Sequence, residues 1–284
     1  MSRRVLVTGA ASGLGLALVR RFASGGDRVL ATDRAESVDV LPDSVEYLPM
    51  DVRSDDDWAR VHEWVASEWN GLDVLVNNAG VAAAGRIDRV TMDEWQWITD
   101  INLLGVARGC HTFAGMFKQQ RSGHIVNVAS IAGLVHPPGM SSYNAVKAAV
   151  VALSETLGHE LAPYDVSCSV ACPSFFRTNL AASLRGSDTD VEKKAAQLIN
   201  TSNLSADDVA AVVLEGIAKR NPLILTDRVG RMSYWTKRLC RPLYDRQMAT
   251  TARRTFEREQ AAAASPAPPR AEGAGPVETT EDRA

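Results

Sequence analysis

Apolar residues along the chain fall into two patterns: short continuous runs, and longer stretches in which they recur every three or four positions. Short β-rich runs predict strands, and the three-to-four spacing predicts helices. The predicted strands cover residues 5–8, 28–32, 45–49, 73–76, 125–129, 166–171 and 223–225, and the predicted helices cover 14–23, 55–69, 92–119, 141–161 and 207–219. Apolar strands that alternate with helices indicate a parallel sheet covered on both faces, and right-handed crossovers make this a doubly wound α/β fold.

The pattern also divides the chain. We expect one domain over residues 1–228. Within it, residues 174–204 form an insertion longer than a strand-to-helix connection requires, and such loops are usually lids or binding loops. Residues 229–258 form a basic, aromatic extension that we expect to be helical. Residues 259–284 cannot bury enough apolar surface to offset their ordering entropy, so we expect a disordered tail.

Composition narrows the class of protein. The 284 residues are 45% hydrophobic and 23% charged, which is typical of a soluble globular protein and excludes a mainly disordered chain or a disulfide-stapled miniprotein. The net charge of −3 gives no reason to expect a nucleic-acid partner. Four cysteines and five histidines without metal-ligand spacing predict no metal site and favour a reducing, cytoplasmic location. No apolar run reaches the ~18 residues that a membrane-spanning helix needs.

The turn after the first predicted strand is rich in glycine. Its sequence, Thr8-Gly9-Ala10-Ala11-Ser12-Gly13-Leu14-Gly15, joins that strand to the first helix. Glycine lets the backbone turn sharply and approach a pyrophosphate, which then lies at the positive end of the helix. The spacing differs from the commonest dinucleotide fingerprint, and glycines at such a turn can serve packing alone. The residues expected to bind a dinucleotide here are Gly9, Ser12, Gly13, Leu14 and Gly15.

Asp33 supports that interpretation. It closes the second predicted strand 18 residues after Gly15, near the ~20 expected for a carboxylate that hydrogen-bonds a ribose 2′-hydroxyl. This position favours NAD as the cofactor. Arg34 follows directly and could instead hold a 2′-phosphate, so NADP is the second possibility.

Tyr143 and Lys147 lie four residues apart in a predicted helix and therefore share one face. A tyrosine ionises near pH ~10, and a nearby ammonium stabilises the phenolate and lowers that pKa. The pair alone is common, because most exposed pairs of this spacing have no catalytic meaning.

Six motifs in a fixed order carry a family resemblance. They are the glycine turn, Asp51-Val52 after the third strand, Asn77-Asn78-Ala79-Gly80 after the fourth, Asn102 in the long helix, Ser130 after the fifth strand, and Tyr143-x-x-x-Lys147. Over residues 3–228 the chain resembles a short-chain dehydrogenase/reductase. The resemblance implies a Rossmann-type domain that acts as an oxidoreductase with NAD(H) or NADP(H).

The resemblance also implies catalytic roles. Tyr143 would be the general acid/base that exchanges a proton with the substrate oxygen, and Ser130 would hydrogen-bond that oxygen. Lys147 would hold the nicotinamide ribose and lower the pKa of the tyrosine. Asn102 would bind a water that relays protons from the lysine, or would only kink its helix.

Further positions are expected to hold the cofactor. Those implied for adenine and its ribose are Asp51, Val52, Asn78, Ala79 and Gly80. The family commonly has Pro-Gly after the sixth strand, where this chain has Pro173-Ser174. Pro173 and Thr178 would contact the nicotinamide end, although the serine leaves the backbone path there open.

Apolar side chains gather in two loops beside the expected catalytic centre. They are Phe175, Phe176, Leu180 and Leu184 in the insertion, and those of His136-Pro137-Pro138-Gly139-Met140 before the tyrosine. They indicate a substrate with a hydrophobic body, contacted by Phe175 and Phe176 and held at its oxygen by Ser130 and Tyr143. The alternative is that they only pack the insertion.

The extension has a different character. From Arg228 to Arg258 it carries nine bases, together with Tyr234, Trp235, Tyr244 and Phe256. Such a stretch could lie on an anionic membrane surface as a peripheral contact, or pack on a partner subunit or on the body.

Together these features predict an enzyme that interconverts a small-molecule secondary alcohol and a ketone. The alternative from another class is a catalytically silent dinucleotide-binding redox sensor, which would be free to lose the proton-handling residues. An epimerase or dehydratase would be expected to carry extra acid/base groups beside the tyrosine. The resemblance also implies a homodimer or homotetramer packed through the helices around 93–119 and 141–161.

Overall fold

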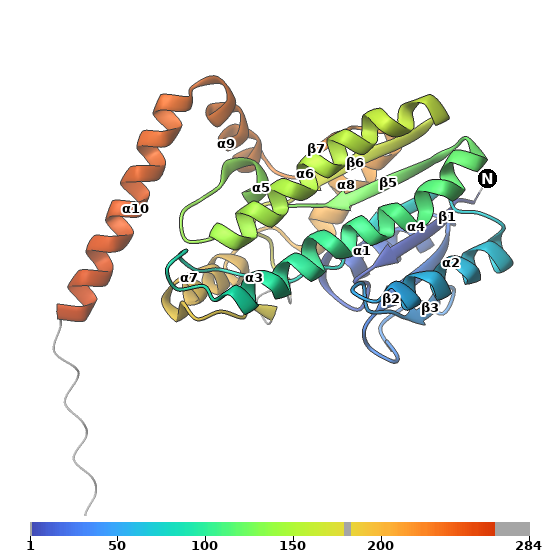
Figure 1. The fold of residues 1–284 in the computed structure, drawn as a ribbon, viewed down its shortest axis with the longest axis horizontal. Helices are drawn as coiled ribbons and strands as arrows, with labels where there is room; N and C mark the ends of the chain where they lie inside the picture. The colour runs from blue at the N-terminus through green and yellow to red at the C-terminus, as the bar shows by residue number, and fades with distance from the viewer. Residues whose placement is uncertain (1, 179–182, 265–284) are drawn as a thin grey trace, which may run out of the picture.

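The computed structural model describes residues 2–178 and 183–264, and these form a seven-stranded parallel sheet between layers of helices (Figure 1). In spatial order the strands are β3 (Glu46–Pro49), β2 (Arg28–Asp33), β1 (Arg4–Thr8), β4 (Val74–Asn77), β5 (Gly123–Val128), β6 (Val166–Cys172) and β7 (Leu223–Leu225). All neighbouring strands are parallel, so their carboxyl ends meet at one edge. The predicted doubly wound α/β fold is confirmed.

Helices cover both faces of the sheet. One layer holds α1 (Gly13–Ser24) and α8 (Ala206–Ala218), and the other holds α2 (Asp55–Trp69), α4 (Gly105–Gln120) and α6 (Ser141–Leu161). Strand β1 contributes side chains to both layers: Leu6 packs with the second layer, and Val5 and Val7 pack with the first. All three side chains are fully buried, and removing them from water stabilises each layer on the sheet.

The single helix predicted over 92–119 is interrupted. It consists of α3 (Met92–Thr99), a π-helical turn (Asp100–Leu104) and α4. In that turn the Asn102 side chain accepts from the Val81 N–H and donates to the Val81 carbonyl, both at 2.8 Å. The interruption thus coincides with a partner 21 residues away, which the hydrophobic period of the segment cannot show.

Other elements complete the chain. The short helix α5 (Ala132–Val135) follows β5, and α7 (Thr189–Asn200) lies within the insertion. The extension forms α9 (Arg228–Leu239) and α10 (Arg241–Ala264), and α10 stands away from the sheet (Figure 1). The described part of α10 thus includes residues 259–264 of the predicted tail, where a run of alanines, the best helix formers, ends the helix. The rest of the predicted tail lies outside the described residues.

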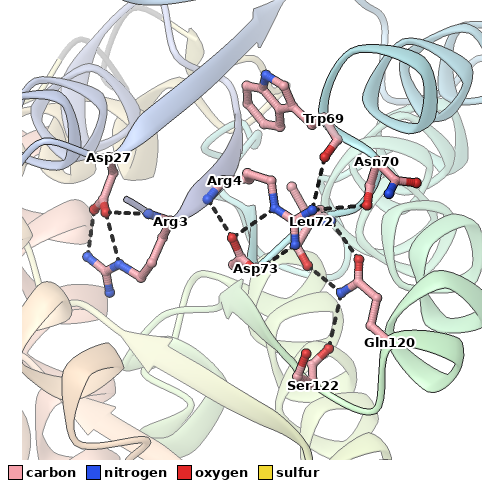
Figure 2. Close-up of polar contacts among 9 residues, drawn as sticks. All are labelled: Arg3, Arg4, Asp27, Trp69, Asn70, Leu72, Asp73, Gln120 and Ser122. Atoms are coloured by element: carbon pink, nitrogen blue, oxygen red, sulfur yellow. Dashed lines mark hydrogen bonds and ion pairs between the residues drawn. The ribbon is translucent and has the colours of Figure 1, made fainter. Parts of the chain in front are cut away.

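Polar contacts tie the amino edge of the sheet (Figure 2). The backbone N–H of Arg4 donates to the Asp73 carboxylate at 2.7 Å, and its guanidinium donates to the same group at 3.0 and 2.8 Å. Gln120, at the end of α4, pairs with both backbone groups of Leu72 at 2.9 and 2.7 Å. These contacts join β1, β4 and α4 at the edge opposite the strands' carboxyl ends.

None of the described helices combines the length and the apolar composition that crossing a bilayer would require.

Candidate active site

A cavity of about 760 Å³ opens at the carboxyl edge of the sheet. The predicted site residues that line it are Gly9, Ser12, Gly13, Leu14, Asp33, Arg34, Asp51, Val52, Asn78, Ala79, Gly80, Ser130, Tyr143, Lys147, Pro173, Phe175, Phe176 and Thr178. Of the predicted residues that the structure describes, Gly15 and Asn102 do not line it. Residues far apart in the chain therefore meet around one volume.

The glycine turn adopts a backbone that side chains disfavour. Gly9 and Gly13 have φ of 67° and 54°, in the left-handed region. A Cβ on Gly9 would lie 2.7 Å from the Ala79 Cα, and one on Gly15 would lie 2.1 Å from the Gly9 carbonyl oxygen. Gly15 therefore serves close packing behind the cavity. Ser12, at the start of α1, makes no side-chain capping bond in the described structure, which leaves N–H groups of the first turn for an anion.

Asp33 lies beside this turn. One of its carboxylate oxygens accepts from the Ala11 N–H at 2.9 Å, and the other accepts from the Arg34 N–H at 2.7 Å. The carboxylate is thus fixed at the end of β2, whereas the Arg34 side chain is exposed.

Asp51 lies at the end of β3 and pairs with Arg53 at 2.6 Å. Hydrogen bonds from the Arg53 guanidinium hold the pKa of this carboxyl below its usual range. Asp51 therefore stays ionised at the rim of the cavity.

Asn78 fixes the floor of the cavity. Its side-chain amide donates to the carbonyls of Thr8 and Gly9 at 2.9 and 3.1 Å. The Thr8 hydroxyl in turn accepts from the backbone N–H groups of Asn78 and Ala79, at 3.1 and 3.0 Å. The ends of β1 and β4 are therefore locked together where the glycine turn begins.

Tyr143 and Lys147 lie one turn apart on α6, both buried, with the lysine Nζ 5.9 Å from the centre of the tyrosine ring. Nζ donates to the Val128 carbonyl at 2.9 Å. Ser130 follows β5, and its hydroxyl accepts from the Ala132 N–H at 3.1 Å. The structure thus brings the three predicted proton-handling groups to one wall of the cavity.

Burial has the largest effect on the pKa values of Tyr143 and Lys147. It raises the pKa of Tyr143 to about 12, a shift that the hydrogen bond with Ser130 only reduces. It lowers the pKa of Lys147 to about 8. The lowered tyrosine pKa expected from the Tyr–Lys pair is therefore not found, because burial has the largest effect on this phenol.

Asn102 is fully buried, and the two polar groups of its side chain are both taken by Val81. These two bonds hold the π turn against Val81, and the predicted water-binding role of Asn102 stays a prediction. A Cβ on Gly80 would lie 3.1 Å from the Asn102 Oδ1 and 3.7 Å from the Lys147 Nζ. Gly80 is therefore close to both side chains, and Asn102 of the π turn lies behind the lysine, since it does not line the cavity as Lys147 does.

The insertion covers one side of the cavity. Asp188 is nearly completely buried and receives hydrogen bonds from the backbone and guanidinium of Arg86, the shortest at 2.7 Å. Those bonds lower the pKa of the Asp188 carboxyl, so the pair is charged at neutral pH. The Ser183 hydroxyl also accepts from the Ala82 N–H at 3.0 Å. These contacts attach the insertion to the body.

Sequence reasoning missed α7. Ala195 and Ile199 of this helix are buried and line the cavity. Their spacing of four, with Asp190 and Glu192 in the first turn, is a helix signal that the sequence does contain.

The two predicted substrate phenylalanines differ. Phe176 is 9% exposed and packs into the core under α1 and α8, whereas Phe175 is half-buried. Leu184 lines the cavity, and Leu180 lies outside the described residues. Thr178 lies against the glycine turn, since a Cβ on Gly13 would come within 2.4 Å of its hydroxyl oxygen.

Within the described ranges, no group of three or more His, Cys, Asp or Glu side chains is arranged to hold a metal ion.

Comparison with known proteins agrees with this geometry. The family model described as short chain dehydrogenase matches residues 3–189. The chain is 34% identical over 187 residues to the 3-oxoacyl-acyl-carrier-protein reductase FabG of Thermotoga maritima, covering 63% of this chain and 76% of that protein.

Solved structures of dehydrogenases with bound cofactors are also similar to this chain. A short-chain dehydrogenase/reductase from Burkholderia phymatum in complex with NAD is 30% identical, with a TM-score of 0.79, covering 85% of this chain and 95% of that chain. A serine dehydrogenase complexed with NADP⁺ is 25% identical, with a TM-score of 0.71, covering 80% and 95%. The chain belongs to the short-chain dehydrogenase/reductase family.

Proposed function

We propose that the protein interconverts a secondary alcohol and a ketone, with NAD(H) as the preferred cofactor and NADP(H) as the second possibility. One observation carries the proposal: Ser130, Tyr143 and Lys147 line the same cavity as the glycine turn. A hydroxyl, a phenol and an ammonium around one volume suit proton transfer to or from a substrate oxygen.

The residues present fit a nicotinamide dinucleotide. The uncapped first turn of α1 offers N–H groups to a pyrophosphate, and the left-handed glycines before it let the backbone approach. Asp33 would accept from the ribose hydroxyls, while Lys147 and Thr178 would hold the nicotinamide end beside Pro173. The residues proposed for adenine and its ribose are Asp51, Val52, Asn78, Ala79 and Gly80. When bound, the cofactor supplies or accepts the hydride.

Tyr143 would move the proton. With a pKa of about 12 it keeps its proton at neutral pH, so it suits donation to a carbonyl oxygen as a ketone is reduced. Ser130 would hydrogen-bond the same oxygen and fix its position. The phenolate left behind would be reprotonated by way of Lys147, whose pKa of about 8 lies close to neutral. Asn102 would contribute through its π turn behind the lysine.

The substrate would have a hydrophobic body. Apolar side chains from the insertion and from the body line the cavity: Phe175, Leu184, Ala195 and Ile199 from the insertion, and Ala82, Trp97 and Met140 from the body. Burial of apolar substrate surface against them would supply binding energy.

The test is a panel of secondary alcohols and ketones, run with both cofactors and followed by nicotinamide absorbance. We expect turnover of apolar members, and a turnover about 10²–10⁴-fold lower with the Tyr143→Phe variant. Tight cofactor binding without turnover of any member would instead indicate the redox sensor.

We further propose a cytoplasmic homodimer or homotetramer packed through α4 and α6, as the family resemblance implies. Light scattering on the purified chain checks the assembly, and a monomer at working concentration would contradict it.

A further inference from the structure

Helix α9 presents its apolar side chains outward. Met232, Trp235 and Leu239 are 64%, 49% and 74% exposed. Their spacing of three and four places them in one stripe along the helix. The side of α9 that faces the body is held by polar groups, since the Lys237 ammonium donates to the Leu134 carbonyl and contacts the His136 ring at 2.7 Å. In a helix that packs on a core, the apolar side faces the protein. In α9 the apolar side faces outward and a polar side faces the protein.

Basic residues flank the stripe. Arg228, Arg231 and Arg238 are all exposed, and α9 contains no acidic residue. Arg228 and Arg231 border one surface depression together with Met232 and Trp235. The next acid along the chain, Asp245, is already paired with Arg241 at 2.8 Å. The exposed face of α9 is therefore apolar at its centre and positive at its sides.

We propose that this face, the α9 stripe, docks on an anionic membrane surface. A helix of this kind buries its apolar side chains at the boundary between headgroups and acyl chains, while arginines pair with lipid phosphates. Tryptophan is favoured at that depth, because its ring is apolar and its N–H can remain hydrated. The occupant is thus a lipid surface contacted from one side.

A second copy of the chain fits this face less well. In a two-fold interface the same patch meets itself. The α9 stripe would then bring arginines against arginines with no carboxylate of α9 between them. Like charges placed this way disfavour the contact.

The stripe is joined to the candidate active site. α9 and α10 bind three consecutive residues of the segment that follows Ser130: Lys237 contacts Leu134 and His136, and the Tyr244 hydroxyl donates to the Val135 carbonyl. The next residue, Pro137, lines the cavity. If the proposed function holds, membrane docking would keep the cavity beside the bilayer from which an apolar ketone or alcohol partitions.

Vesicle sedimentation with the full chain tests the proposal. We expect binding to phosphatidylcholine vesicles that contain phosphatidylglycerol, little binding to phosphatidylcholine alone, and loss of binding at high salt. Replacing all three arginines by Gln should weaken partitioning by about 10²-fold, because each basic residue near an anionic surface contributes roughly fivefold. Met232→Ser combined with Trp235→Ser should weaken it by about tenfold or more.

Matched control substitutions test whether any exposed methionine or arginine has the same effect on vesicle binding as those of the α9 stripe. Met92 of α3 is 77% exposed, and Arg89 before it is also exposed. Met92→Ser and Arg89→Gln should leave vesicle binding unchanged. Turnover without vesicles should be unchanged in every variant, which keeps this test independent of the proposed function and reports correct folding.

A second measurement uses the unmodified stripe. Brominated acyl chains should quench part of the tryptophan fluorescence of the wild type, and Trp235→Phe should remove that part. Equal binding to neutral and anionic vesicles, or no binding to either, would overturn the proposal. It would also be overturned if the arginine variant changed the oligomeric state while the wild type ignored vesicles, because the stripe would then be a subunit interface.

Discussion

At Tyr143 two physical effects oppose each other. Burial disfavours the phenolate, and the hydrogen bond with Ser130 favours it. Burial has the larger effect, so the pKa is about 12, although the Lys147 ammonium lies 5.9 Å from the centre of the ring. The phenol is therefore a proton donor at neutral pH, and its hydroxyl is what the proposed chemistry depends on.

Tyr143→Phe tests that dependence. The substitution keeps the ring in its buried position and removes only the hydroxyl. We expect kcat to fall by about 10²–10⁴-fold, the usual contribution of a positioned acid or base. Cofactor affinity, measured by fluorescence titration, should change little. Retention of more than about a tenth of wild-type turnover would remove Tyr143 from this role.

We expect Asp33 to set the preference between NAD and NADP. Its carboxylate is fixed by the N–H groups of Ala11 and Arg34, so it cannot turn away from an incoming 2′-phosphate. Asp33→Asn removes the charge and keeps an oxygen that can accept from Ala11. We expect the NADP/NAD ratio of kcat/KM to rise by about 10- to 100-fold, since juxtaposed like charges cost up to several kcal/mol.

Arg34→Gln is the matched control for that charge. If Asp33 excludes NADP in the wild type, Arg34→Gln should reduce NADP use further and leave NAD use nearly unchanged. A wild type that already prefers NADP would show that Arg34 governs the site.

Among the elements, those with local signals could be predicted from the sequence. The helix predicted over 55–69 has the bounds of α2, because Ser54 caps its first turn and apolar residues recur along it. The π turn at Asn102 could not be predicted, because its partner, Val81, lies in a different segment. The length of the insertion predicts a lid or binding loop, and the spacing of Ala195 and Ile199 in it is a local signal for α7 that the prediction does not use.

The prediction of a hydrophobic substrate depends on side chains of the insertion. Phe176 packs into the core and has only its edge at the cavity, so Phe176→Ala should mainly lower the free energy of unfolding, by about 3–5 kcal/mol, with similar losses for all substrates. Leu184 is only half-buried and lines the cavity. Leu184→Ala should flatten the preference for longer ketones by roughly fourfold per methylene lost from contact, since each buried methylene contributes ~0.8 kcal/mol.

Kinetics on a homologous ketone series, beside a melting curve for each variant, distinguishes the two positions. Equal losses across the series for Leu184→Ala would mean that the insertion does not contact the substrate body.

For the molecule as a whole, stability depends on contacts at the amino edge of the sheet. Burial alone would raise the pKa of Asp73, but hydrogen bonds from the Arg4 side chain and backbone outweigh it and lower that pKa. A carboxyl with a lowered pKa stabilises the fold above the ordinary value of ~3.9, and this contribution is lost as pH falls through the lowered value.

Asp73→Ala should therefore reduce the free energy of unfolding by about 1–3 kcal/mol at neutral pH, the cost of leaving hydrogen-bonding partners unpaired. The difference from the wild type should shrink as the pH falls through that lowered pKa, where the wild-type carboxyl is itself protonated. Urea unfolding at neutral pH and in acid provides the measurement. A difference that is the same at both would mean that the charge of Asp73 does not matter.

The polar ties at the amino edge (Figure 2) and the cavity lie at opposite ends of the strands. A five-residue strand such as β1 spans roughly 16 Å, and substitutions more than ~7–10 Å apart usually have additive effects. Changes around Arg4 and Gln120 should therefore combine freely with changes around Leu184. In laboratory evolution, substitutions at the amino edge could first raise the stability of the fold. Substitutions at the carboxyl edge could then alter substrate preference, with little epistasis between the two steps.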